Sequence, residues 1–240
     1  MEESQPFQSG AAGGEAEFLL IAHDNLARAL EGEGKIDLAL VHYREALRIA
    51  PGFFNAQYNM AGALARQGMM DQAITHFEEA LRIRPDYAEG HNLFGVFLAG
   101  LGRRAQAITE YDKVLRLGPR HAGAHNNLGV ALALEGKKDQ SEEHYREALR
   151  INPFYFEAHN NLGSLLAGRA ELDEAIGHFR EAIRIHSNYA SARNNLARAL
   201  YLREDYAGAW REVALHRKQG GTPDPKLLAD LSARMPEPKE

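Results

Sequence analysis

The stretch that decides the fold is His125–Pro153, HNNLGVALALEGKKDQSEEHYREALRINP, because its pattern recurs along most of the chain at one fixed spacing. A proline ends each copy of the pattern, at Pro51, Pro85, Pro119 and Pro153. These prolines stand 34 residues apart, and Ser187 takes the place of a fifth. A constant period of this length is the signature of a repeat array, in which each unit stacks on its neighbours.

Six units fit this period without an insertion when the proline is counted as position 32 of its unit. They begin at Leu20, Phe54, Ala88, Ala122, Phe156 and Ala190. Each unit contains two helical patterns, helix A and helix B, with small residues at position 8 of helix A and position 20 of helix B. Small side chains at a helix crossing allow close approach, so the pattern predicts two antiparallel helices per unit.

Large apolar residues occupy positions 7 and 24 and predict the core. Position 7 carries Leu26, Met60, Phe94, Leu128, Leu162 and Leu196, and position 24 carries Tyr43, Phe77, Tyr111, Tyr145, Phe179 and Val213. Glycines at position 15 are expected to close helix A in the left-handed conformation: Gly34, Gly68, Gly102 and Gly136. Carboxylates at position 18 are expected to satisfy free N–H groups at the start of helix B: Asp37, Asp71, Asp139 and Asp173.

The two ends of the chain differ in composition from the repeats. Residues 1–14 are rich in small and polar residues, which predicts a disordered tail, with the first helix starting near Glu15. Six repeats are then expected over residues 15–221. Leu227, Leu228 and Leu231 form one apolar stripe within residues 222–234, which predicts a helix that caps the array. Residues 235–240 are expected to be disordered.

A period of 34 with two helices and a terminal proline resembles the tetratricopeptide repeat. The resemblance implies an all-α, right-handed superhelical solenoid of six helix pairs with a C-terminal capping helix. It also implies a concave groove lined by positions 2, 5, 6, 9, 12 and 13 of the A helices, in which a protein or peptide partner binds.

Asparagine dominates two of these groove positions. Position 6 carries Asn25, Asn59, Asn127, Asn161 and Asn195, and position 5 carries Asn92, Asn126, Asn160 and Asn194. An amide both donates and accepts hydrogen bonds, so such a row could pair with the backbone of an extended peptide. The row resembles the asparagine ladder of O-linked N-acetylglucosamine transferase repeats. Val96 and Val130, at position 9, would add apolar contacts. The alternative is structural, with each asparagine bonding a neighbouring helix.

Several functions are disfavoured by the sequence. A net charge of -5 argues against nucleic-acid binding, and the chain has no cysteine to hold a metal. Eleven histidines include a row at position 4 and a row at position 23 that is expected on the outer face, but equivalent sites in successive repeats lie too far apart to share one metal ion. We expect no cofactor. No nucleotide-binding or hydrolase motif is present, so we expect no catalytic activity.

These observations predict a cytoplasmic, non-catalytic scaffold that binds a protein or peptide partner in its groove. The N-terminus lacks the pattern of a secretory signal, and no apolar stretch is long enough for membrane insertion. The carboxylate-binding residues of chaperone adaptors are absent, since position 6 carries no basic residue. One alternative is a substrate-recruiting subunit of a glycosyltransferase whose catalytic domain is on another chain. Another is self-association through the ends of the array.

Overall fold

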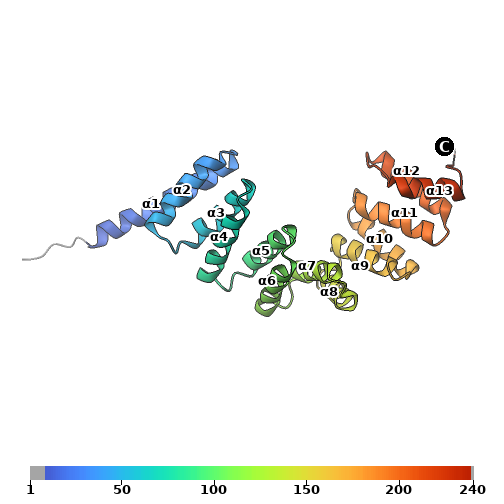
Figure 1. Cartoon of the computed structure of the whole chain (residues 1–240), viewed down its shortest axis with the longest axis horizontal. Helices are drawn as coiled ribbons and strands as arrows, with labels where there is room; N and C mark the ends of the chain where they lie inside the picture. The colour runs from blue at the N-terminus through green and yellow to red at the C-terminus, as the bar shows by residue number, and fades with distance from the viewer. Residues whose placement is uncertain (1–8, 239–240) are drawn as a thin grey trace, which may run out of the picture. The chain divides into compact units, whose positions relative to one another are not determined.

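The computed structural model describes residues 9–238, and the regular secondary structure of this range is entirely α-helical (Figure 1). The helices are α1 (Ser9–Gly32), α2 (Ile36–Ile49), α3 (Phe54–Arg66), α4 (Met70–Ile83), α5 (Ala88–Gly100), α6 (Arg104–Leu117), α7 (Ala122–Leu134), α8 (Lys138–Ile151), α9 (Phe156–Ala167), α10 (Leu172–Ile185), α11 (Ala190–Leu202), α12 (Tyr206–Lys218) and α13 (Pro225–Arg234). Every expected repeat contributes two of them, and α13 follows. The predicted all-helical architecture of paired helices is therefore confirmed.

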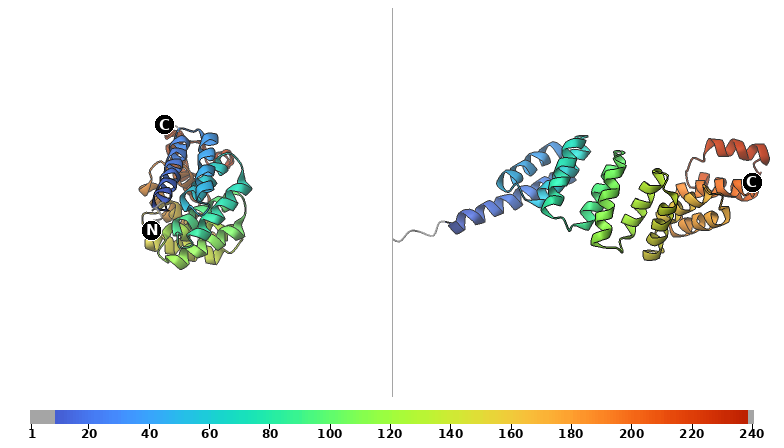
Figure 2. Two further views of the ribbon diagram at one scale, coloured as in Figure 1. Left: turned by 90° about the vertical axis from the view of Figure 1, so that its left-hand side faces the viewer. Right: turned by 60° about the horizontal axis from the view of Figure 1, so that its bottom comes forward.

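The chain divides into two compact units, Met1–Gly90 and His91–Glu240. In the first unit α1 packs on α2 and α3 packs on α4, while α2 and α1 both contact α3. Helix α1 begins at Ser9 and not near Glu15, so residues 9–14 are helical where a disordered tail was expected. Residues 1–8 of that predicted tail lie outside the described range. The first half of α1 extends beyond the end of α2 (Figure 2).

In the second unit the pairs α7–α8, α9–α10 and α11–α12 stack in chain order, and the B helices α6, α8 and α10 each also pack on the A helix of the next repeat. Helix α13 packs on α12 and buries Leu227 and Leu231 in a core that continues back to Tyr145. The indole N–H of Trp210 donates to the carbonyl of Met235 at 3.0 Å. Arg217 pairs with Glu237, so part of the predicted C-terminal tail contacts the array. Residues 239 and 240 lie outside the described range.

The small position 8 lies directly against the ring at position 24. A methyl group added at Gly95, Gly129 or Gly163 would come within 2.5 to 2.8 Å of the ring of Tyr111, Tyr145 or Phe179, respectively. This distance is shorter than carbon atoms tolerate, which explains why these repeats use glycine. The sequence prediction that small residues permit close helix approach is borne out by this packing.

The turn between helices A and B needs a left-handed residue in every repeat. Gly34, Gly68, Gly102 and Gly136 have φ between 75° and 79°, as expected. In repeats five and six the same position is held by Ala170, with φ of 63°, and by Glu204, with φ of 65°. Since a side chain is unfavourable in this region, the last two repeats carry backbone strain that the others avoid.

The position-18 carboxylates do lie in the first turn of helix B, but they do not cap it. The residues that precede these helices make no side-chain cap, and Asp139 and Asp173 are directed toward the next repeat. Asp139 pairs with Arg169 at 2.5 Å, and Asp173 pairs with Arg203 at 2.8 Å. Asp37 accepts in the same way from Gln67. These carboxylates therefore link successive repeats, in addition to their favourable position at the helix dipole.

Candidate partner-binding groove

The asparagines of the second unit form a ladder between successive A helices. The side-chain amide of a position-6 asparagine donates to Oδ1 of the position-5 asparagine in the preceding repeat. The pairs are Asn127 with Asn92 at 3.1 Å, Asn161 with Asn126 at 3.0 Å, and Asn195 with Asn160 at 3.0 Å. The bonding to neighbouring helices that the structural alternative predicted is therefore present, and the ladder spans repeats three to six.

The two members of each pair differ in exposure. Asn92, Asn126 and Asn160 are buried, so the bonds they accept satisfy atoms that water cannot reach. Asn127, Asn161 and Asn195 are half-buried and border the surface. Among the described residues, Oδ1 of Asn161 and of Asn195 has no hydrogen-bond donor. An acceptor on each of these two asparagines therefore stays available to a ligand.

The remaining predicted asparagines have different surroundings. Asn194 accepts from the backbone N–H of Asp224 at 3.4 Å, which continues the ladder into the capping segment. In the first unit, position 5 of repeat one is Asp24, whose Oδ1 atom is buried without a hydrogen-bond partner in the described structure, while Asn25 is exposed on α1. Burial raises the pKa of Asp24 despite the opposing effects of the Asn59 amide and the Arg28 charge.

Three pockets line the second unit at equivalent repeat positions. Each lies between two successive A helices and the B helix that connects them. The first, about 180 Å³, is lined by Val96, Ala99, Arg104, Tyr111, Asn127, Val130, Ala131 and Leu134. The second, about 340 Å³, is lined by Val130, Ala133, Leu134, Lys138, Tyr145, Asn161, Ser164, Leu165 and Gly168. The third, about 250 Å³, is lined by Ser164, Ala167, Gly168, Phe179, Asn195, Arg198, Ala199 and Leu202.

Adjacent pockets share walls, so the three form one row. Val130 and Leu134 border the first and second pockets, and Ser164 and Gly168 border the second and third. Each pocket has a position-6 asparagine in its wall and an aromatic ring at its base. Val96 and Val130 lie in this row, as the sequence predicted. An apolar surface with a few fixed amides is the usual composition of a ligand site.

One cation borders each pocket, and the sequence analysis missed all three. Arg104 and Lys138 both stand at position 17, the first residue of helix B, while Arg198 stands at position 9 of α11. The recurrence of a basic residue at position 17 was the available signal. It went unused because the family resemblance assigns the groove to A helices alone.

The two histidine rows meet inside each repeat. Position 4 of helix A contacts position 23 of helix B: His23 with His42 at 3.0 Å, Gln57 with His76 at 2.6 Å, His91 with Glu110 at 2.6 Å, His125 with His144 at 2.9 Å, His159 with His178 at 2.9 Å, and Arg193 with Glu212 at 2.8 Å. The position-23 histidines are half-buried in these pairs.

In several repeats the position-4 side chain also forms a hydrogen bond with a backbone carbonyl in the turn that precedes its own repeat. Gln57 donates to the carbonyl of Pro51 at 2.9 Å, His125 contacts that of Pro119 at 3.0 Å, and His159 that of Pro153 at 3.1 Å. Because a carbonyl only accepts, Nε2 of His125 must carry the proton, and its Nδ1 then accepts from His144. Burial, and secondly the facing His125, lowers the pKa of His144, and the same causes act on His178 beside His159.

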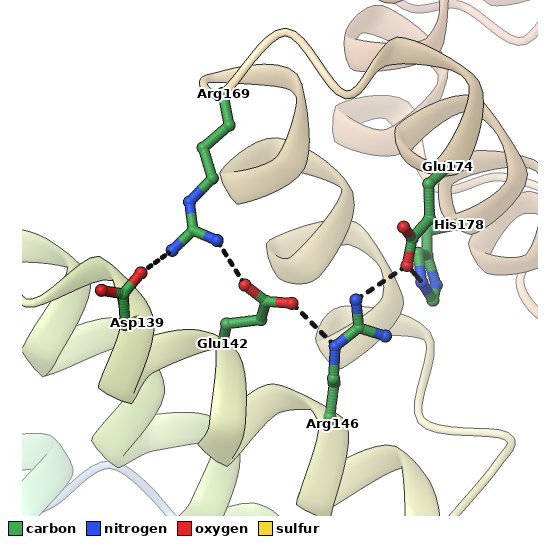
Figure 3. A network of polar contacts seen from close by, with 6 residues as sticks. All are labelled: Asp139, Glu142, Arg146, Arg169, Glu174 and His178. Atoms are coloured by element: carbon green, nitrogen blue, oxygen red, sulfur yellow. Dashed lines mark hydrogen bonds and ion pairs between the residues drawn. The ribbon is translucent and has the colours of Figure 1, made fainter.

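Charged side chains of α8 and α10, together with Arg169 in the turn after α9, connect repeats four and five (Figure 3). Arg169 contacts Asp139 and Glu142, both at 2.5 Å, and Glu142 accepts from Arg146 at 2.8 Å. Arg146 in turn reaches Glu174 at 2.8 Å. These partners lower the pKa of Glu142 and raise that of Arg146. The network is largely exposed, so it contributes more to the relative orientation of the two repeats than to the free energy of unfolding.

Within residues 9–238 no three His, Cys, Asp or Glu side chains gather as a metal site would require. No helix in this range has the length and apolarity needed to cross a membrane.

The chain is an α-helical repeat protein, as its helix pairs and their 34-residue period show. Proteins of this class present extended concave surfaces that can bind a partner. Tetratricopeptide repeat models match residues 30–95, 98–156, 135–190 and 160–215. The chain belongs to the tetratricopeptide repeat family. No curated protein matches it significantly.

Solved structures with the same fold share little sequence with the chain. PilF of Pseudomonas aeruginosa is 21% identical with a TM-score of 0.74, covering 92% of this chain and 99% of its own. PilW, described as a type IV pilus biogenesis factor, is 22% identical with a TM-score of 0.73, covering 89% and 98%. YrrB, described as a repeat protein with an unusual peptide-binding site, is 22% identical with a TM-score of 0.62, covering 77% and 96%. The similarity to the transferase repeats stays a prediction.

Proposed function

We propose that the protein is a non-catalytic scaffold whose second unit binds an extended segment of a partner protein in the row of three pockets. The observation that carries this proposal is the recurrence of one pocket at equivalent positions in three successive repeats. Each pocket offers an aromatic base, apolar walls and one position-6 asparagine. A repeated pocket suits a repeated ligand, and a polypeptide presents side chains at regular intervals.

The ladder geometry supports a specific division of roles. Amide nitrogens of Asn161 and Asn195 are used in the inter-repeat bonds, which leaves their Oδ1 atoms to accept from backbone N–H groups of the ligand. Apolar ligand side chains would fill the pockets beside Val96, Val130 and Leu134. Arg104 and Lys138 favour acidic residues next to these apolar ones, whereas Arg198 already pairs with Asp224 at 3.2 Å. The preferred ligand is therefore an apolar segment interrupted by Asp or Glu.

The peptide-binding site described for YrrB and the description of PilW as a pilus biogenesis factor agree with a scaffold function for this fold. The cytoplasmic location is proposed on the absence of cysteine alone, which suits a reducing compartment.

A displayed library of random peptides tests the proposal without knowledge of the natural partner. Peptides selected on the full chain should bind through apolar residues flanked by acidic ones. Ala133→Phe fills the second pocket while leaving the asparagine ladder intact, and it should weaken binding at least tenfold with no change in the melting temperature. Ala214→Phe, the same substitution at an exposed site on α12, should have no effect. Unchanged affinity of the Ala133→Phe variant would refute binding in the groove.

Replacing Asn127, Asn161 and Asn195 together with Ala is a less specific test, because these side chains also join the repeats. The triple variant should lose stability as well as affinity, since Oδ1 of each buried position-5 asparagine then loses its donor. Binding and melting temperature should therefore be measured on the same preparation, and only the Ala133→Phe result decides the location of the ligand.

A further inference from the structure

The third pocket of the row differs from the first two in its charges. Arg104 and Lys138, which border the first and second pockets, are exposed and form no ion pair with a described residue. Both stand at position 17, the first residue of a B helix. In repeat five this position is Leu172, so the start of α10 brings no cation to the third pocket. Arg198, on the A helix α11, lines that pocket instead.

The charge of Arg198 is balanced by another residue of the chain. Its Nη1 atom lies 3.2 Å from Oδ2 of Asp224, the residue that precedes α13. Arg203, directly after the end of α11, is also paired, with Asp173 at 2.8 Å. The residues that line the third pocket, taken with their ion-pair partners, therefore carry no net positive charge, whereas the first and second pockets each keep one.

Several contacts hold the carboxylate of Asp224 in place. The backbone N–H of Asp224 donates to Oδ1 of Asn194 at 3.4 Å. Its Oδ1 atom accepts from the backbone N–H of Lys226 at 2.9 Å and so caps the N-terminus of α13. Pro223, directly before it, is buried. The chain on both sides of Asp224 is thus fixed, and the Oδ2 atom that does not cap the helix is the one that faces the arginine.

We propose that Asp224 sets the charge selectivity of the third pocket: this pocket takes an uncharged apolar residue of the ligand, while the first two take apolar residues that have an acidic neighbour. An acidic ligand residue at the third pocket would lie beside the Asp224 carboxylate, and the repulsion between like charges would offset its attraction to Arg198. The inference rests on the proposed binding of an extended segment in the row of pockets. It adds the order of charges along that segment.

Parallel selections from the displayed peptide library test this order, one on the full 240-residue chain and one on its Asp224→Asn variant. Asparagine keeps an oxygen that caps α13 and removes the charge beside Arg198, so the melting temperature should not change. Peptides selected on the unmodified chain should lack acidic residues at the end that occupies the third pocket, and those selected on the variant should carry them there. Ala167→Phe fills the third pocket and identifies that end, because truncating it then no longer changes the affinity.

A matched pair of peptides measures the effect. The tightest peptide from the unmodified chain is synthesised with Glu and with Gln at its third-pocket end. At low ionic strength, Asp224→Asn should tighten binding of the Glu peptide about three- to fivefold relative to the Gln peptide. Adding Arg198→Gln should cancel this gain, because the site is then again without net charge. Asp230→Asn, which removes one charge elsewhere on α13, is the control and should not distinguish the two peptides.

The outcomes separate this inference from the function on which it rests. Failure to select any peptide, or unchanged affinity of the Ala133→Phe variant, would refute binding in the groove and the charge order with it. Acidic residues at the third-pocket end of peptides from the unmodified chain, or a Glu peptide that Asp224→Asn does not favour, would overturn the charge selectivity alone. If Asp224→Asn lowers the melting temperature, Asp224→Ser repeats the test, because serine also caps a helix and carries no charge.

Discussion

The ring of Tyr145 on α8 lies so close to Gly129 on α7 that a methyl group at Gly129 would meet its Cε1 atom at 2.7 Å. Tyr145 is itself 3% exposed and belongs to the continuous core of the second unit, so its ring has little freedom to move. The backbone of helix A therefore serves as the packing surface for the aromatic residue of helix B. This contact sets the spacing of the two helices.

Substituting Gly129 with Ala should destabilise the protein despite the higher helix propensity of alanine. The gain in propensity is about 1 kcal/mol, whereas overpacking a rigid core costs about 1 to 3 kcal/mol. We expect a lower midpoint in chemical denaturation. Gly177→Ala on α10 is the control, because its added methyl group meets no atom within 4 Å, and it should stabilise. Equal shifts for both variants would contradict this account of the packing.

Leu162→Ala and Leu26→Ala should differ greatly, although both change position 7 of a repeat. Leu162 is fully buried, so its truncation should cost about 2 to 5 kcal/mol. Leu26 is 46% exposed in one copy of the chain, so its truncation should cost less than about 1 kcal/mol. Denaturation at concentrations low enough to keep the chain monomeric gives the comparison. A large loss for Leu26→Ala would show that its face is covered within the single chain.

Acid should destabilise the protein through its paired histidines. Burial lowers the pKa of His144 and His178 in the folded state, so below the unfolded value of about 6.5 the unfolded chain binds more protons. The stabilising contribution is complete above that pH and is lost as the pH falls toward the folded pKa. In the His125→Gln variant a glutamine would face His144, as Gln57 faces His76. The variant would also lack the His125 charge that lowers the pKa of His144. It should reduce the fall in melting temperature between pH 7.5 and 5.5.

The reciprocal variant gives the control for this pH effect. Gln57→His would place a second histidine beside His76, whose pKa is already lowered chiefly by burial. The loss of stability in acid should then increase. Identical pH profiles for the two variants and the unmodified chain would show that the pairs do not govern the acid response.

Ala170→Gly should stabilise the fifth repeat. Ala170 has φ of 63°, and glycine adopts this conformation without the steric cost of a side chain. We expect a gain of about 1 kcal/mol, measured by chemical denaturation. Ala167→Gly, three residues earlier at the C-terminal end of α9, should not stabilise, because its backbone is helical and has no steric strain for glycine to relieve. A loss of stability for Ala170→Gly would show that the turn depends on the alanine methyl group.

Removal of residues 222–240 should weaken the last repeat. The truncation exposes the face that Leu227 and Leu231 cover and removes the acceptor of the Trp210 N–H. The melting temperature should fall, and the uncovered apolar face should promote association. The substitution Lys226→Ala, at an exposed site on α13, keeps the helix in place and should have no effect. A truncated chain of equal stability would mean that α13 does not act as a cap.

Much of the architecture follows from local sequence rules. The period locates the helices, and the small residue at position 8 opposite a ring at position 24 predicts their close approach. The left-handed glycines also lie where they were expected. Each of these signals acts between residues of one repeat, where spacing along a helix determines which side chains meet.

The polar contacts were harder to predict because they depend on the angles between helices. Asp139 and Asp173 occupy the expected first turn, yet they bond arginines of the next repeat instead of the helix end. The two histidine rows are visible in the sequence, but their contact across a repeat requires knowledge of which faces meet. The asparagine row was recognised with both of its interpretations open, and the structure adds that its nitrogen and oxygen atoms face different neighbours.

The contact between positions 4 and 23 also restricts how this chain can be recombined. A whole repeat carries both members of its pair, so exchanging complete repeats preserves the contact. Exchanging a single helix instead brings together residues that do not pair in the native chain. Pairing α9 with α12 would place His159 opposite Glu212, a combination like that of His91 with Glu110. Pairing α11 with α10 would place Arg193 opposite His178. Complete helix pairs can therefore be exchanged between repeats of this protein, whereas single helices can be exchanged only in selected combinations.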